Sequence, residues 1–205
     1  MLKLTFVWLF LLSSAAFSAE AVRVIDGDPV KLGETTIRLH GIDAPEYGQK
    51  CATPSGGSWP CGKEATILLQ SLVLGKSVTC DDRGSDGYGR IIGVCSVDGI
   101  DVNAEMVAIG AAWAFRKYSD DYALLEDAAR EGQIGVWQAD TQTPWDYRSA
   151  KWEVAAQEAP EGCPIKGNIS KSGRIYHAPW SPWYSRTKVS VDKGEHWFCS
   201  EAEAV

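Results

Sequence analysis

The sequence has little positive charge and, after its first segment, no long hydrophobic run. Only 20 of its 205 residues are Lys or Arg, against 27 Asp or Glu, for a net charge of −7. The deficit lies in residues 20–150, which hold 12 basic and 20 acidic residues, whereas residues 151–205 hold seven of each. This charge excludes a general electrostatic attraction to nucleic acid, because phosphates favour basic surfaces. An anionic substrate must be held by a local cluster of cations or by a bound metal.

The first segment is apolar over residues 4–12, with Lys3 before it and small residues after it. This order is typical of a secretory signal peptide, and the run is shorter than the roughly 20 residues of a membrane span. We expect a signal peptide over residues 1–19, cleaved near Ser18 or Ala19, with a retained anchor as the alternative. Later stretches are too polar to cross a bilayer. The mature chain is therefore expected to be secreted or periplasmic, without membrane contact, and monomeric.

Six cysteines fit export to an oxidising compartment, where an even number favours disulfides. Proximity along the chain favours three pairs, although other connectivities are open. These pairs are Cys51 with Cys61, Cys80 with Cys95, and Cys163 with Cys199.

The order of predicted elements indicates the fold class. Alternation of apolar and polar residues predicts antiparallel strands over residues 22–42, 77–82 and 88–102, with a hairpin turn at Asp98-Gly99. Apolar stripes at helical spacing predict helices over residues 63–76, 103–110 and 118–132. A Gly-, Pro- and Ser-rich loop occupies residues 47–62. Strands covered by helices predict an α+β domain on a curled antiparallel barrel, over residues 20–148.

A small aromatic module is expected at residues 161–205, after a linker at residues 149–160. The module is too short for a core of its own, so it needs a disulfide or docking onto the first domain. Its stretches "IKGNIS", "GRIYH" and "EHWFCSE" resemble a short module found in some exported bacterial proteins, and its partner is unknown. A zinc site is the alternative to the disulfide, with Cys163, His177, His196 and Cys199 as ligands.

Three short stretches bring charged residues close together in the sequence. They are "VIDGDPV" with Asp26 and Asp28, "IRLHGIDAPE" with Arg38, Asp43 and Glu46, and "DGYGR" with Asp86, Tyr88 and Arg90. Each stretch alone is typical of a turn or of solvated surface charge. In this order and spacing, residues 22–148 resemble the staphylococcal nuclease (thermonuclease) family.

The resemblance implies an OB-fold barrel with packed helices that hydrolyses phosphodiesters of DNA and RNA with calcium. By position, Asp28, Asp43 and the backbone carbonyl of Ala44 match the ligands of Ca²⁺, a metal that prefers oxygen donors. The matching catalytic residues are Arg38 and Arg90, which clamp the phosphate, and Glu46, which holds or deprotonates the attacking water. Tyr88 and Tyr118 fall near substrate-binding tyrosines of the family.

These residues predict an exported calcium-dependent nuclease. One alternative is a catalytically weak OB-fold module that binds nucleic acid or the cell envelope, and another is a phosphodiesterase acting on small nucleotides. Clustered carboxylates repel one another unless a cation balances them, which favours the metal-dependent enzyme. Pro29 stands where the family usually has threonine, and a cysteine-bracketed insertion follows Glu46, so substrate preference stays open.

Overall fold

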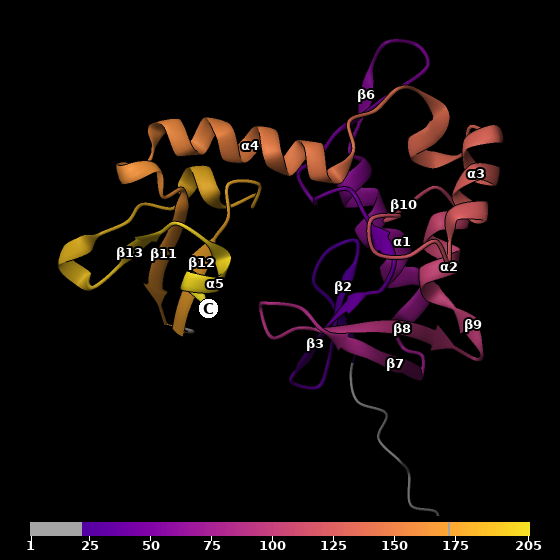
Figure 1. The fold of residues 1–205 in the computed structure, drawn as a ribbon, viewed down its shortest axis with the longest axis horizontal. Coiled ribbons are helices and arrows are strands. Elements are labelled where there is room, and N and C mark those ends of the chain that lie inside the picture. The colour runs from indigo at the N-terminus through magenta and orange to yellow at the C-terminus, as the bar shows by residue number, and fades with distance from the viewer. Residues whose placement is uncertain (1–21, 172) are drawn as a thin grey trace, which may run out of the picture.

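The structure is a computed structural model that describes residues 22–171 and 173–205, and the expected signal peptide lies outside the described residues. A larger region of strands and helices is joined to a small C-terminal sheet by helix α4 (Pro144–Glu158), drawn in orange in Figure 1. Within the described ranges, every helix is too short or too polar to cross a membrane.

Six strands form the main sheet, in the order β1-β2-β3-β8-β7 with β9 paired to β8. Their bounds are β1 (Val22–Val24), β2 (Pro29–Leu32), β3 (Thr35–Leu39), β7 (Val78–Ser85), β8 (Ile91–Val97) and β9 (Ile100–Asp101). The pairs are antiparallel except β3 with β8, which run parallel and are joined by a long connection that includes helix α1 (Cys61–Val73) and strand β7. The α+β class is confirmed. Among the described strands, β1 and β7 stay at the sheet edges, so the expected barrel is not closed.

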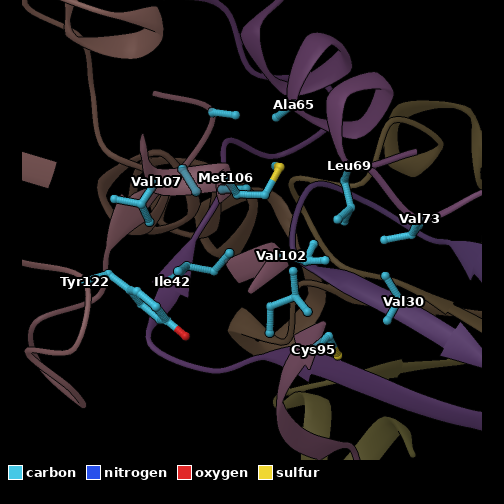
Figure 2. Close-up of a cluster of buried hydrophobic side chains, with 14 of the residues drawn as sticks. Val30, Ile42, Ala65, Leu69, Val73, Cys95, Val102, Met106, Val107 and Tyr122 are labelled. Atoms are coloured by element: carbon cyan, nitrogen blue, oxygen red, sulfur yellow. The ribbon is translucent and has the colours of Figure 1, made fainter. Parts of the chain in front are cut away.

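Helices α1 and α2 (Val102–Ala108) pack on this sheet, and their apolar faces form with the strands the core shown in Figure 2. Helix α1 buries Ala65, Leu69 and Val73, which are spaced four residues apart and therefore share one face. Helix α2 buries Met106 and Val107 in the same cluster. Helix α3 (Ala123–Glu131) packs against α2. These buried side chains hold the main sheet, which carries Arg38 on β3 and Asp28 and Arg90 in the turns next to its strands.

Two short strand pairs complete the larger region. Strand β4 (Ile42–Asp43) pairs with β10 (Trp113–Ala114), and β5 (Cys51–Ala52) pairs with β6 (Ser58–Trp59). All three predicted disulfides are present, which are Cys51–Cys61, Cys80–Cys95 and Cys163–Cys199. The alternative zinc site is wrong, because the disulfide between Cys163 and Cys199 takes both thiolates away from a metal.

The C-terminal sheet has the order β12-β11-β13, from β11 (Ile165–Ser170), β12 (Gly173–His177) and β13 (His196–Phe198), and the short helix α5 (Glu201–Ala204) follows. The expected linker is largely helical, since residues 149–158 belong to α4. Thr143 caps α4 by accepting a hydrogen bond from the Asp146 amide, and Pro144 occupies the first turn, where its missing N–H costs nothing.

Met106 is fully buried at the centre of the core, so its truncation tests how far this core stabilises the fold. We expect Met106→Ala to lower the free energy of unfolding by about 2–5 kcal/mol, through lost transfer energy and the cavity left behind. Urea denaturation followed by circular dichroism measures the loss. Leu124→Ala is the control, because Leu124 is 83% exposed, and a loss as large as that of Met106→Ala would contradict the description of the core.

Candidate active site

The main sheet and β4 bring three of the predicted residues into contact. Asp28 lies in the turn between β1 and β2, Arg38 lies on β3, and Asp43 lies on β4 with its side chain buried. The Nη2 atom of Arg38 is 3.2 Å from Oδ1 of Asp43 and 3.3 Å from Oδ2 of Asp28. Arg38 therefore balances two carboxylates that would otherwise repel each other in a poorly solvated place.

The turn that carries Asp28 is held by Asp26. The Asp26 carboxylate accepts hydrogen bonds from the amides of Gly27 and Tyr47 and from the Thr66 hydroxyl of α1. A Cβ atom at Gly27 would lie 2.6 Å from Cβ of Ala44, so only glycine lets the two loops approach this closely. Burial raises the pKa of Asp26 to about 6, and the nearby Asp28 adds to this effect. Asp26 thus orders the two loops from beside the site.

The backbone of Glu46 is positioned by two neighbours. Gln49 is buried, and its Oε1 accepts a hydrogen bond from the Glu46 amide while its Nε2 donates to the carbonyl of Gln142. Gly62, in the first turn of α1, packs directly on Glu46, because a Cβ atom there would lie 1.7 Å from the Glu46 carbonyl oxygen. The disulfide Cys51–Cys61 closes the loop just after this point. The start of α1 therefore sets the position of Glu46.

Arg148 joins two of the predicted residues. It lies on α4, and its Nη1 and Nη2 donate to the two carboxylate oxygens of Asp43 over 3.0 and 2.6 Å. The same Nη1 atom donates to Oε1 of Glu46 over 2.8 Å. Burial alone would lower the pKa of Arg148, but the carboxylates of Asp43 and Glu46 raise it, so the guanidinium stays charged. A bidentate pair of this kind is a strong, geometrically specific interaction.

Burial shifts two of the carboxyl groups toward their neutral forms. It raises the pKa of Asp28, and Asp43 adds to the rise, whereas Arg38 acts against it. Burial also raises the pKa of Glu46 to about 8, with Arg148 acting in the opposite direction. A carboxyl group with a pKa near neutrality can take up a proton from water during a reaction, as a general base must.

Arg90 reaches the site from the hairpin between β7 and β8. Its Nε donates to Oδ2 of Asp86 over 2.7 Å, and its guanidinium lies 5.4 Å from the ring centre of Tyr88. Burial would raise the pKa of Asp86, but hydrogen bonds from Arg90 and from the backbone of Tyr88 hold it below its usual range. The ionised Asp86 therefore orients Arg90 and leaves the rest of its guanidinium for a ligand.

The predicted residues line two adjoining cavities. Asp28, Arg38, Glu46 and Arg90 line one of about 570 Å³, which we call the catalytic cavity. A second cavity of about 780 Å³ shares Arg38 and Arg90 with it and contains Tyr118.

Tyr88 borders both cavities, whereas Tyr118 borders only the second, where its ring packs edge-on against Phe115. The structure thus gathers the predicted carboxylates and arginines at one place. Of the two predicted substrate-binding tyrosines, Tyr88 lines the catalytic cavity and Tyr118 does not.

The carboxylates can be tested as ligands of a hard cation. The Oδ2 atom of Asp28 is buried and receives no hydrogen bond, so it lacks a full set of partners. Asp43 lies beside it, and the buried Ala44 follows directly. Within residues 22–171 and 173–205 there is no cluster of three His, Cys, Asp or Glu side chains suited to a metal. A cation here would rely on two carboxylates together with backbone and water oxygens, which oxygen-seeking divalent ions accept.

Two residues of the site carry no role in the sequence-based prediction. Arg148 ends the stretch "PWDYR", 105 residues after Asp43, and only the fold brings the two together. Gln49 lies in a segment read as a loop. A lone arginine or glutamine in such a context has no local signal that would single it out.

Removal of Arg148 should leave the buried Asp43 carboxylate with Arg38 as its remaining cation. We expect Arg148→Gln to lower the free energy of unfolding by about 3 kcal/mol, the scale for breaking one side of a buried ion pair. Chemical denaturation at neutral pH measures this loss. Arg23→Gln, at an exposed position of β1, is the matched control and should change stability by about 0.5 kcal/mol or less. Equal effects of the two variants would contradict the role of Arg148.

Comparison with known proteins supports the likeness stated above. The model of a family described as "Staphylococcal nuclease homologue" matches residues 36–139, and a second model, described as ArfC, matches residues 142–205. A protein of Escherichia coli named "Uncharacterized endonuclease" is 39% identical over 145 residues, which are 67% of this chain and 88% of that protein. "Micrococcal nuclease" of Shigella flexneri is 32% identical over 154 residues, covering 66% of this chain and 83% of its own length.

A rice protein named "Probable staphylococcal-like nuclease CAN1" is 36% identical over 128 residues, or 61% of this chain and 36% of the rice protein. The expected enzyme class, a hydrolase of the nuclease type, is confirmed by these relatives. Through the match over residues 36–139 and the similarity to relatives covered over most of their length, the chain belongs to the family of staphylococcal nuclease homologues.

Proposed function

We propose that this chain is an exported, calcium-dependent nuclease that hydrolyses phosphodiester bonds of DNA or RNA on an OB-fold framework. One observation carries the proposal: Asp28, Arg38, Glu46 and Arg90 line a single cavity, and Asp43 contacts Arg38. The names of the relatives, which include an endonuclease and a micrococcal nuclease, support nucleic acid as the substrate.

In this proposal Glu46 is the general base. It accepts a proton from a water molecule as that water attacks phosphorus. The bond from phosphorus to the leaving oxygen breaks, and that oxygen takes up a proton from the solvent to become a hydroxyl group. Its raised pKa supports this role, since the neutral form that results from proton uptake is stabilised by burial. The hydrogen bond from Gln49 to the Glu46 backbone and the contact with Gly62 hold the base in place.

Arg38 and Arg90 are the phosphate clamps. The attack places additional negative charge on the phosphoryl oxygens, and two fixed guanidinium groups stabilise that charge without having to reorganise. Each arginine is already oriented by a carboxylate, Arg38 by Asp28 and Asp43 and Arg90 by Asp86. This arrangement places two oriented guanidinium groups in one cavity of an acidic protein.

Calcium is proposed at Asp28, Asp43 and the carbonyl of Ala44, where it would polarise the phosphodiester and neutralise its charge. The buried Oδ2 atom of Asp28, which receives no hydrogen bond and contacts Arg38 at 3.3 Å, supports this place. Arg148 already binds both carboxylate oxygens of Asp43, so calcium and Arg148 must share that carboxylate.

Export is supported by the three disulfides, which account for all six cysteines. Such bonds persist in oxidising compartments and are rare in the cytosol. A secreted or periplasmic location therefore suits the chemistry of the chain.

Release of acid-soluble nucleotides from denatured DNA and from RNA tests the proposed activity. The purified chain should release nucleotides from at least one polymer with calcium and none with a chelator. Glu46→Gln should lower kcat about 100- to 10,000-fold, the range for loss of a general base. Glu64→Gln, at an exposed position of α1, is the matched control and should keep full activity.

Three results would contradict this proposal in different ways. Hydrolysis that persists in chelator would exclude a dependence on calcium. Hydrolysis of a dinucleotide without hydrolysis of either polymer would identify a phosphodiesterase of small nucleotides. Absence of hydrolysis on every substrate would identify a binding module.

The raised pKa of Glu46 predicts the dependence of activity on pH. The base acts only in its ionised form, so kcat/KM should fall as the pH drops through about 8 and level off above it. Initial rates from about pH 5 to about pH 10 measure this limb. The residual activity of Glu46→Gln should lack it, and a wild-type limb at the ordinary value of 4.5 would rule out burial as the controlling influence.

A further inference from the structure

The C-terminal module forms one side of the catalytic cavity. The main sheet of the larger region and its turns contribute Asp28, Arg38 and Arg90, and the opposite side comes from α4, β12 and the segments after β12 and β13. Figure 1 shows α4 running from the larger region to this sheet, which places the module beside the strands that carry the site. The first domain alone would therefore lack the side chains that α4 and the module contribute to this cavity.

Aromatic residues dominate the module side of the cavity. Trp152, Tyr176 and Trp180 line it, and we call these three the aromatic wall. Trp152 follows Arg148 by one helical turn, so the two lie on the same face of α4. The rings of Trp152 and Trp180 lie 6.2 Å apart at 34°.

The aromatic wall is not the core of the module. Ile165 and Ala178 are buried there, whereas Trp152 and Trp180 remain partly exposed and Tyr176 is 38% exposed. Packing alone would bury these rings further, because large aromatic side chains gain most from full burial. Their exposed faces therefore remain available to a ligand in the cavity.

The cations of the cavity come from the larger region and from α4. Arg38 and Arg90 lie in the larger region and Arg148 on α4, and Asp28 and Glu46 pair with Arg38 and Arg148. The module contributes the carboxyl group of Glu201, whose pKa is raised by burial while Arg90 acts against the rise. A phosphate is attracted to the arginines, so it belongs beside Arg38 and Arg90. The aromatic wall then suits a flat, uncharged group that is attached to that phosphate.

We propose that the aromatic wall is a nucleobase-binding subsite beside the phosphodiester site. A base stacks on exposed aromatic faces whatever its sequence, since every base has a π-face. The cavity of about 570 Å³ falls within the size range of sites for small ligands. A base that stacks there must be unpaired, so the module selects nucleotides from a single-stranded segment. The inference rests on the proposed function, because it places the base next to the hydrolysed bond.

The test compares binding with and without bases. Fluorescence anisotropy measures the Kd of a labelled single-stranded oligothymidylate with phosphorothioate linkages, and of an abasic oligomer of equal length and charge. The full chain is compared with Trp180→Ala and Trp180→Phe. Trp183→Ala is the control, because Trp183 belongs to the same module, is 54% exposed and does not line the cavity. Circular dichroism confirms that each variant is folded.

We expect Trp180→Ala to weaken binding of the oligothymidylate about 5- to 100-fold, the range for loss of one stacked base. Binding of the abasic oligomer should not change, and Trp180→Phe should keep most of the affinity for bases. Equal weakening for both oligomers, no weakening, or tighter binding of the oligothymidylate would overturn the subsite. Base-dependent binding without hydrolysis would instead overturn the proposed nuclease and leave the subsite in place.

Discussion

The buried pair of Asp43 and Arg148 is the interaction on which the rest of the site depends. Asp43 has no access to water, so its charge requires a partner in a fixed position. Arg148 supplies that partner from α4 and extends to Glu46. One guanidinium therefore connects the carboxylates of the larger region to the helix that carries the C-terminal module. The contact of Arg148 with Asp43 thus both ties α4 to the larger region and balances the charge of the site.

The balance of charge around the cavity explains how an acidic protein can bind an anion. Asp28, Asp43 and Glu46 would repel a phosphate, but each is close to an arginine or is shifted toward its neutral form by burial. The net charge of −7 then lies elsewhere on the molecule. The arginines of the cavity can hold one phosphate of a long polyanion, which favours local recognition over general adhesion.

Sequence reasoning succeeded where the information is local. Asp98 and Gly99 both adopt positive φ, as the predicted hairpin turn requires, and the disulfides join cysteines that are neighbours in the sequence or bracket one small module. The parallel pairing of β3 with β8 was beyond such reasoning, because it depends on the path of the long connection that includes α1 and β7. The same is true of Arg148 and Trp180, whose partners are set by how α4 and the C-terminal sheet return to the site.

Gly62 shows how far the constraints of the site extend along the chain. It belongs to the first turn of a helix and carries no charge or ligand, yet any side chain there would collide with the carbonyl of Glu46. In a library of random variants, this position should therefore be depleted as strongly as the charged residues of the cavity. Positions that pack on the Glu46 backbone will be intolerant of mutation even when their side chains carry no charge. A count of intolerant positions therefore overstates the number of groups that contact the substrate.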